Sequence, residues 1–178
     1  AIAAAGIALS MTQGWPARLE KNVVQTASLL DYRQGSAFRS SSCFLSSSSR
    51  SKPLDQALCL TPVPLKRNVL LVGDSHGAHI WYGLAAAYPD THFMQATVSG
   101  CKPLLVPNGD ARCYEIQHEV LTKTIAQTQP DAILLSARWK SADLKSVIDT
   151  VHQLSQKVAH VTVMGRIVEY RNPLPQLM

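Results

Sequence analysis

The sequence predicts an α/β fold in which helices cover both faces of a doubly wound parallel sheet. Four short, mostly apolar runs are typical of buried strands, at residues 69–72, 92–98, 132–136 and 160–164. Segments with helical spacing follow the first three runs, at residues 75–88, 114–128 and 141–158. Strands that alternate with helices favour parallel pairing through right-handed crossovers. A chain of 178 residues is long enough to bury one sizeable core.

The helix after the third run carries the clearest apolar stripe. Ser141 is a plausible N-cap for it. The stripe consists of Leu144, Val147, Ile148, Val151, Leu154 and Val158. This spacing predicts that all six side chains face the sheet.

The turn between the first strand and its helix is the most informative stretch. Gly73 ends the apolar run, so Asp74, Ser75 and His76 lie between the carboxyl end of a strand and the amino end of a helix. Open α/β sheets bind ligands at that edge, and the unpaired first N–H groups of a helix favour developing negative charge. Ser75 can therefore present its hydroxyl to a pocket with its own N–H beside a reacting carbonyl.

The same turn has other interpretations. As a simple N-cap, Asp74 or Ser75 would only cap the start of the helix, a role that is compatible with catalysis. Neither a dinucleotide fingerprint nor a phosphate loop is present, so no nucleotide cofactor is expected. His76 and His79 have a spacing that a metal could use, but no second cluster of ligands accompanies them, and we expect no metal.

The charge pattern excludes one class of partner. The net charge is +5, yet lysine and arginine are scattered, and no basic run is interleaved with aromatic residues. Nucleic acid is therefore not an expected partner. A mild positive excess fits an envelope protein near anionic lipids or glycans.

The four cysteines fall into two local pairs. Cys43 lies near Cys59, and Cys101 lies near Cys113, with no Cys-x-x-Cys motif. The even count and short loops favour two disulfides and an oxidising compartment over four free thiols.

The first 67 residues precede the first strand. Residues 1–11 are apolar but too short to span a bilayer, so we interpret them as the end of a transmembrane helix, with a small buried or frayed helix as the alternative. Trp15 and Arg18 would suit the membrane exit, which extends to residue 19. Residues 20–67 are interpreted as a disulfide-bearing linker packed on the core. A short helix is expected at 21–33. The serine-rich stretch at 36–52 would be a poorly packed loop without its cysteine, and a Cys43–Cys59 bond would tie it to the segment that enters the core.

Gly-Asp-Ser-His at residues 73–76, after an apolar strand, resembles the first block of the SGNH (GDSL-like) hydrolase superfamily. Further features are Ser-Gly-Cys-Lys-Pro at 99–103, a third strand ending in Ser-Ala-Arg-Trp at 136–139, and the cysteine-bearing serine-rich segment. Together they look most like the SGNH domain fused to bacterial membrane O-acyltransferases. The resemblance implies a flavodoxin-like, three-layer α/β/α fold for residues 68–178, with an SGNH domain that is incomplete at its carboxyl end.

The resemblance also implies roles for individual residues. Ser75 would be the nucleophile, and the backbone N–H groups of Ser75 and Gly100 would form the oxyanion hole. On its own, Gly100 would be interpreted as a turn glycine beside a disulfide. Asp74 and His76 would shape the turn. Trp139 would line the pocket or belong to the core.

Two parts of the family pattern are missing. Many SGNH hydrolases carry Gly-x-Asn-Asp after the third strand, whereas residues 136–140 contain no asparagine, as in the fused acyltransferase subgroup. The family's Asp-x-x-His pair follows the fifth strand. Asp149 and His152 match that spacing after Ser75 but fall inside a periodic helix, with His152 off the stripe. We expect the true pair to lie outside this chain.

The predicted function is therefore that of an extracytoplasmic SGNH domain of a bacterial O-acetyltransferase, held at the inner membrane and facing the periplasm. A fused membrane acyltransferase domain would deliver acetyl to Ser75, and a cell-surface glycan hydroxyl would accept it. Two rivals are an esterase that uses water as the acceptor and a non-catalytic glycan-binding or scaffold domain.

Overall fold

The computed structural model describes residues 2–12, 14–28, 33–49, 51–107 and 111–169. The chain divides into two compact units. The terminal unit comprises Ala1–Arg33 and Glu169–Met178, and the sheet unit comprises Gln34–Val168.

The terminal unit contains short helices. These are α1 (Ile2–Met11), the 3-10 turn η1 (Pro16–Arg18) and α2 (Lys21–Ser28). Residues 29–32 of the helix expected at 21–33 lie outside the described residues. None of the helices in the described ranges combines the length and apolar character that crossing a bilayer requires. The interpretation of residues 1–19 as a membrane exit stays a prediction.

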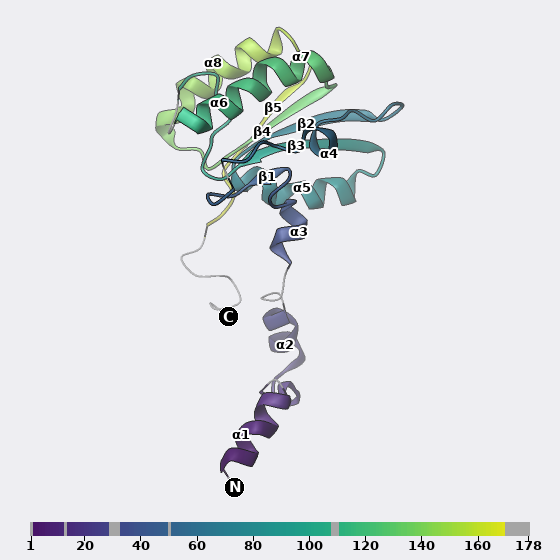
Figure 1. Cartoon of the computed structure of the whole chain (residues 1–178), viewed down its shortest axis with the longest axis vertical. Helices are drawn as coiled ribbons and strands as arrows, with labels where there is room; N and C mark the ends of the chain where they lie inside the picture. Colours follow the sequence, from purple (N-terminus) through teal and green to yellow (C-terminus); the bar gives the residue numbers. More distant parts are fainter. Residues whose placement is uncertain (1, 13, 29–32, 50, 108–110, 170–178) are drawn as a thin grey trace. The chain divides into compact units, whose positions relative to one another are not determined.

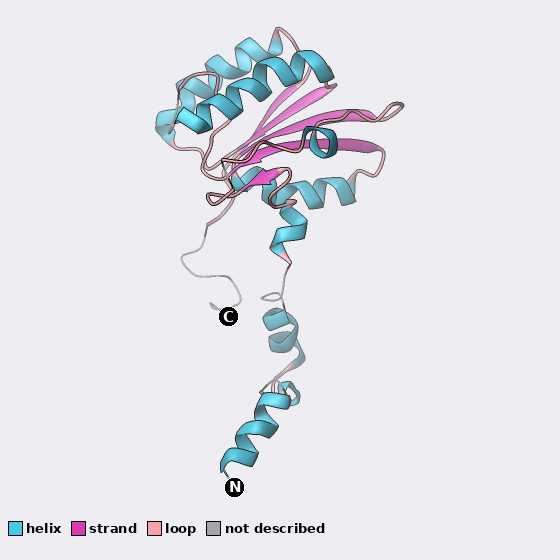
Figure 2. Ribbon diagram, viewed as in Figure 1, coloured by secondary structure: helices cyan, strands magenta, loops and turns pink. Residues whose placement is uncertain are grey.

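Within its described residues, the sheet unit is built on five parallel strands in the order β1-β3-β2-β4-β5 (Figure 2). Their bounds are β1 (Phe44–Leu45), β2 (Arg67–Gly73), β3 (Thr91–Val98), β4 (Ala132–Ser136) and β5 (Val161–Met164). The chain winds from β2 to β3 on one side and then returns to β4 on the other. This confirms the predicted doubly wound parallel sheet and puts its topological switch point at the end of β2.

Helices cover both faces of the sheet (Figure 1). One face packs against α6 (Ala111–Glu119), the π-helical turn η3 (Val120–Thr124), α7 (Ile125–Thr128) and α8 (Leu144–Ser155). The other face packs against α3 (Gln34–Phe38) and α5 (Ser75–Ala87).

Successive side chains of β2 alternate between the two faces of the sheet and so contact both helical layers. Leu70 and Val72 point to the layer that contains Leu121, whereas Val69 packs with Trp81 of α5. Because successive side chains of a strand point to opposite faces, the apolar run at 69–72 serves both cores at once.

The segment before β2 is more ordered than its composition suggests. It contains α3, β1 and the short helix α4 (Gln56–Cys59). Cys43, Phe44 and Leu45 are buried, and β1 pairs with the end of β3. The sequence predicted that its cysteine would tie down a loop at 36–52, and the Cys43–Cys59 bond is present. The sequence did not predict that this stretch also contains part of α3 and the strand β1. A two-residue strand has no period of its own, so pairing with a distant strand creates it.

Both expected disulfides, Cys43–Cys59 and Cys101–Cys113, are present in the structure. They close loops with sequence separations of 16 and 12 residues. In the loop-entropy account, each bond stabilises the fold by roughly 3 kcal/mol.

The start of α8 differs from the prediction. Ser141 begins the 3-10 turn η4 (Ser141–Asp143) instead of capping α8, and the Asp143 carboxylate accepts the Lys140 backbone N–H at 2.6 Å. Leu144 and Ile148 are 64% and 58% exposed. The apolar stripe is thus only partly buried, because helical spacing predicts which side chains share a face but not how far a neighbour extends over that face.

Candidate active site

The turn between β2 and α5 requires glycine at its first position. A Cβ atom on Gly73 would overlap the Ser136 carbonyl oxygen and lie 2.9 Å from its carbonyl carbon. The space at Gly77, in the first turns of α5, is tight but less restricted, since a Cβ there would lie 3.1 Å from Thr97 Cγ2. The absence of these side chains lets the Ser75 turn pack closely against the ends of β3 and β4.

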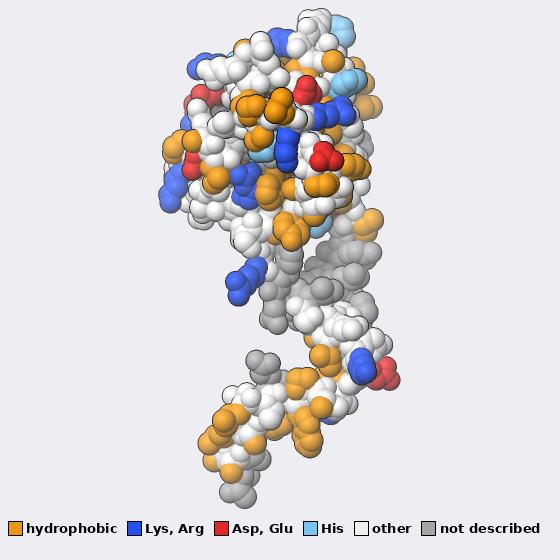
Figure 3. Space-filling view, turned by 90° about the vertical axis from the view of Figure 1, so that its right-hand side faces the viewer, with side chains coloured by type: hydrophobic (Ala, Val, Ile, Leu, Met, Phe, Trp, Pro, Cys, Tyr) orange, Lys and Arg blue, Asp and Glu red, His pale blue; other side chains and the backbone are white. Residues whose placement is uncertain are grey.

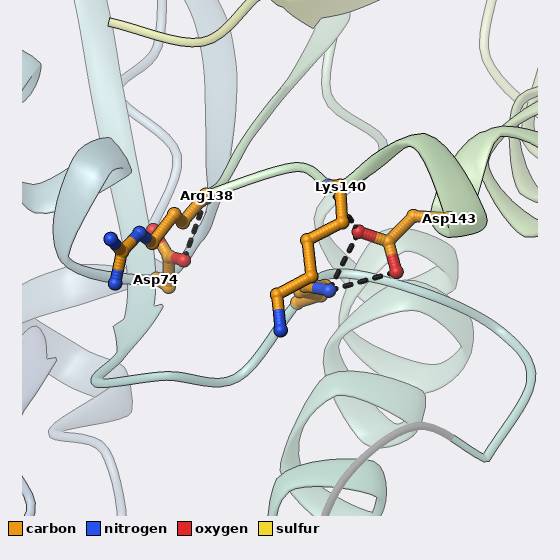
Figure 4. A network of polar contacts seen from close by, with 5 residues as sticks. Asp74, Arg138, Lys140 and Asp143 are labelled. Atoms are coloured by element: carbon orange, nitrogen blue, oxygen red, sulfur yellow. Dashed lines mark hydrogen bonds and ion pairs between the residues drawn. The ribbon is translucent and has the colours of Figure 1, made fainter. Parts of the chain in front are cut away.

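Asp74 holds this turn in place. Its carboxylate is buried, and Oδ1 accepts the His76 backbone N–H at 2.8 Å, which caps the 13-residue helix α5. Oδ2 accepts the backbone N–H of Arg138 at 2.8 Å (Figure 4). One side chain therefore fixes the first turn of α5 to the segment that follows β4. The N-cap interpretation of Asp74 is confirmed, and it leaves the Ser75 hydroxyl available for another role.

Ser75 lies in an open cleft of about 460 Å³ at the carboxyl ends of β2, β3 and β4. Its side chain is half-buried at the amino end of α5. Gly100, which follows β3 with a left-handed φ of 71°, lines the same cleft. The cleft is lined by Asp74, Ser75, Ser99, Gly100, Lys102, Arg138 and Lys140. The fold thus brings together the predicted nucleophile and the predicted oxyanion glycine.

Trp139 and His76 do not line this cleft. Trp139 is buried in the main core, where its Nε1–H donates to the Met164 carbonyl at 2.8 Å. This position corresponds to the core alternative that the sequence left open. His76 lies half-buried in the first turn of α5, and its backbone N–H serves the Asp74 cap.

The ion pair between Lys102 and Asp143 was not predicted from the sequence. Lys102 Nζ lies 2.8 and 2.6 Å from the two carboxylate oxygens of Asp143, across a separation of 41 residues. The two side chains are only 14% and 7% exposed. The pair joins the loop that carries Gly100 to the start of α8. No local pattern links these residues; their only signal was that Lys102 belongs to the block at 99–103.

Removing one partner of this ion pair is expected to destabilise the fold. Asp143→Ala leaves the Lys102 ammonium largely buried without its counter-charge and also frees the Lys140 N–H. We expect the free energy of unfolding to fall by about 3 kcal/mol. Urea denaturation measures this change, and Asp149→Ala, at an exposed position of α8, is the matched control. A double variant, Lys102→Met with Asp143→Leu, should recover much of the loss. An Asp143→Ala protein as stable as the control would contradict this assignment.

A larger open groove, of about 860 Å³, lies at the opposite edge of the sheet. Arg67, Asp131 and His160, at the amino ends of β2, β4 and β5, help to line it. It contains none of the residues of the Ser75 turn. Volume alone does not identify a reactive site, and the chemistry of the described residues favours the smaller cleft.

The Asp149 and His152 pair considered from the sequence does not belong to the Ser75 cleft. Asp149 and His152 are both exposed on α8, and neither lines the cleft. Within the described ranges, no three His, Cys, Asp or Glu side chains gather as a metal site would require. On the face drawn in Figure 3, lysine and arginine side chains are dispersed among neutral ones.

Comparison with known proteins supports this picture of the fold. A family model described as SGNH domain (fused to AT3 domains) matches residues 42–178. The chain belongs to this family. The match begins ahead of β2 and includes Cys43 and β1 to β5.

This SGNH domain also resembles a solved structure, that of the lipopolysaccharide acetyltransferase periplasmic domain from Salmonella ser. Paratyphi A. The TM-score is 0.62 and the sequence identity is 18%, so the likeness concerns the fold. The match covers 78% of this chain but only 57% of the Salmonella domain. A search of curated proteins gives no match.

Proposed function

We propose that this SGNH domain transfers an acetyl group to a hydroxyl of a cell-surface glycan through an acyl-serine at Ser75. The observation that carries the proposal is the shared cleft, where Ser75 and Gly100 lie together at the amino end of α5. The fusion of the family to AT3 domains supports an acetyl donor delivered by a membrane acyltransferase domain. In that arrangement the domain faces the periplasm and is held at the inner membrane, where its two disulfides would persist.

The proposed reaction has two acyl transfers. Ser75 Oγ attacks the carbonyl carbon of the donor, and the negative charge moves to the carbonyl oxygen. The backbone N–H groups of Ser75 and Gly100 hold this oxyanion, and the intermediate then expels the donor's leaving group. The glycan hydroxyl attacks the resulting acyl-serine, an acetyl ester forms on the glycan, and the Ser75 hydroxyl is regenerated.

A base must accept the proton of Ser75 and later that of the acceptor hydroxyl. No histidine is found among the described residues that line the cleft. We propose that the base is a histidine, oriented by an aspartate, from a part of the protein outside the described residues. Arg138, which lines the cleft, would supply the side-chain donor in place of the asparagine found in many SGNH hydrolases.

Hydrolysis is the second candidate, because the cleft is open and gives water access to an acyl-serine. Adding a glycan acceptor to the assay distinguishes transfer from hydrolysis. With p-nitrophenyl acetate as the acetyl donor, a transferase should release p-nitrophenol several-fold faster when glycan oligosaccharides are present, and acetylated glycan should appear by mass spectrometry.

The alternatives predict different results for the full-length protein. An esterase would release p-nitrophenol at the same rate with and without glycan. A scaffold domain would form no acetyl-Ser75 at all, which peptide mapping of the quenched protein would reveal. Either outcome would contradict the transferase proposal.

A further inference from the structure

The cleft around Ser75 carries more positive than negative charge. Three of its seven lining residues are cationic, namely Lys102, Arg138 and Lys140, whereas Asp74 is the sole carboxylate among the described lining residues. Both oxygens of Asp74 already accept backbone N–H groups. This carboxylate is therefore committed to holding the turn.

The two lysines differ in how their charge is compensated. Lys102 is largely buried and faces both oxygens of Asp143. Lys140 donates only its backbone N–H to the same carboxylate, and its side chain is exposed. Across the residues that the structure describes, no hydrogen bond or ion pair involves the Lys140 ammonium. Figure 4 shows the Lys140 side chain extending away from the Asp143 carboxylate.

The backbone of Lys140 is nevertheless fixed. Asp143 holds its N–H at 2.6 Å, and Asp74 holds the N–H of Arg138 two residues earlier at 2.8 Å. The two carboxylates thus anchor the segment that presents both cations to the cleft. An ammonium on an anchored backbone, in the cleft that Ser75 also lines, is suited to bind an anionic group of an incoming molecule.

We propose that the acceptor of this domain is an acidic glycan, whose carboxylate binds Lys140 with Arg138 adding a second positive charge to the same wall. This inference rests on the proposed function. Binding of a uronic acid carboxylate there would direct a neighbouring sugar hydroxyl toward acyl-Ser75. A neutral sugar would leave the Lys140 ammonium without a counter-charge and would gain only hydroxyl contacts.

The first test measures binding without catalysis. The full-length protein with Ser75→Ala is titrated calorimetrically with trigalacturonate and with the neutral trisaccharide of galactose. We expect roughly tenfold tighter binding of the acidic sugar, the effect of one charge-assisted hydrogen bond in an open cleft. The preference should shrink at high salt. Lys140→Met should remove most of it, whereas Lys145→Met, at an exposed position of α8, should retain it.

The second test uses the active protein and compares acetyl transfer to the same two sugars. The ratio of kcat/KM for the acidic over the neutral acceptor should fall about tenfold in Lys140→Met, mainly through KM. Equal affinity for the two sugars, or a preference that survives Lys140→Met, would overturn the inference even if acetyl-Ser75 forms. Failure of Ser75 to become acetylated, with the binding preference intact, would instead overturn the proposed function.

Discussion

Replacing Ser75 with alanine is expected to lower the rate of acetyl transfer by at least about 10⁴-fold, because the nucleophile that carries the acetyl group is lost. The fold should be unaffected. Alanine is a strong helix former, and the cap of α5 is supplied by Asp74, which the substitution does not touch. Mass spectrometry of the acetylated glycan measures the rate, and peptide mapping should show no acetyl group on the peptide that contains residue 75.

The matched control is Ser155→Ala, a serine at the exposed end of α8 away from the cleft. It should transfer acetyl at the rate of the unchanged protein. Circular dichroism of both variants checks that they fold alike. A Ser75→Ala protein that acetylates glycan at the full rate would refute the proposed mechanism, because no acyl-serine could then lie on the pathway.

Gly73→Ala is expected to have the largest effect on stability. The new methyl group would occupy the position of the Ser136 carbonyl oxygen, which belongs to the backbone of β4. A backbone group held by strand pairing on both sides cannot move away as a flexible side chain can. Ordinary overpacking lowers the free energy of unfolding by up to about 3 kcal/mol, and we expect Gly73→Ala to lower it by more than that. Urea denaturation, or the yield of folded protein, measures this loss.

The control for Gly73→Ala is a glycine-to-alanine change at Gly83, in the helix α5 that follows the turn. Gly83 lies in the interior of α5 and a Cβ there would meet no atom within 4 Å. Gly83→Ala should raise the free energy of unfolding by up to about 1 kcal/mol through helix propensity. If Gly73→Ala were as stable as Gly83→Ala, β2 and β4 could not approach as closely as the structure indicates.

Local chemistry was sufficient to predict the elements that form the frame of the site. The apolar runs that became β2 and β4 were evident because strands buried on both faces read as continuous hydrophobic segments. The Ser75 turn was predicted because a glycine, a capping carboxylate and a helical stripe follow one another within a few residues. The pairing of the cysteines was also local, with short loops in both cases.

The features that connect distant segments were not predictable in the same way. The strand β1 exists because Phe44 and Leu45 pair with the end of β3, and two residues have no period that a sequence pattern could reveal. The exposure of Leu144 and Ile148 depends on what covers α8, not on the spacing within it.

The sequence alone thus established the class of fold, the serine at the end of the first long strand and the glycine that follows the next. Tertiary packing determined that these two residues share one cleft and that Lys102 meets Asp143 across 41 residues. It also determined that the exposed side chain of Lys140 lies in the wall of the cleft that Ser75 lines. Turns and helix caps depend on residues that are neighbours in the chain. The charge of a cleft depends on which carboxylates from distant segments reach it, and only folding brings those groups together.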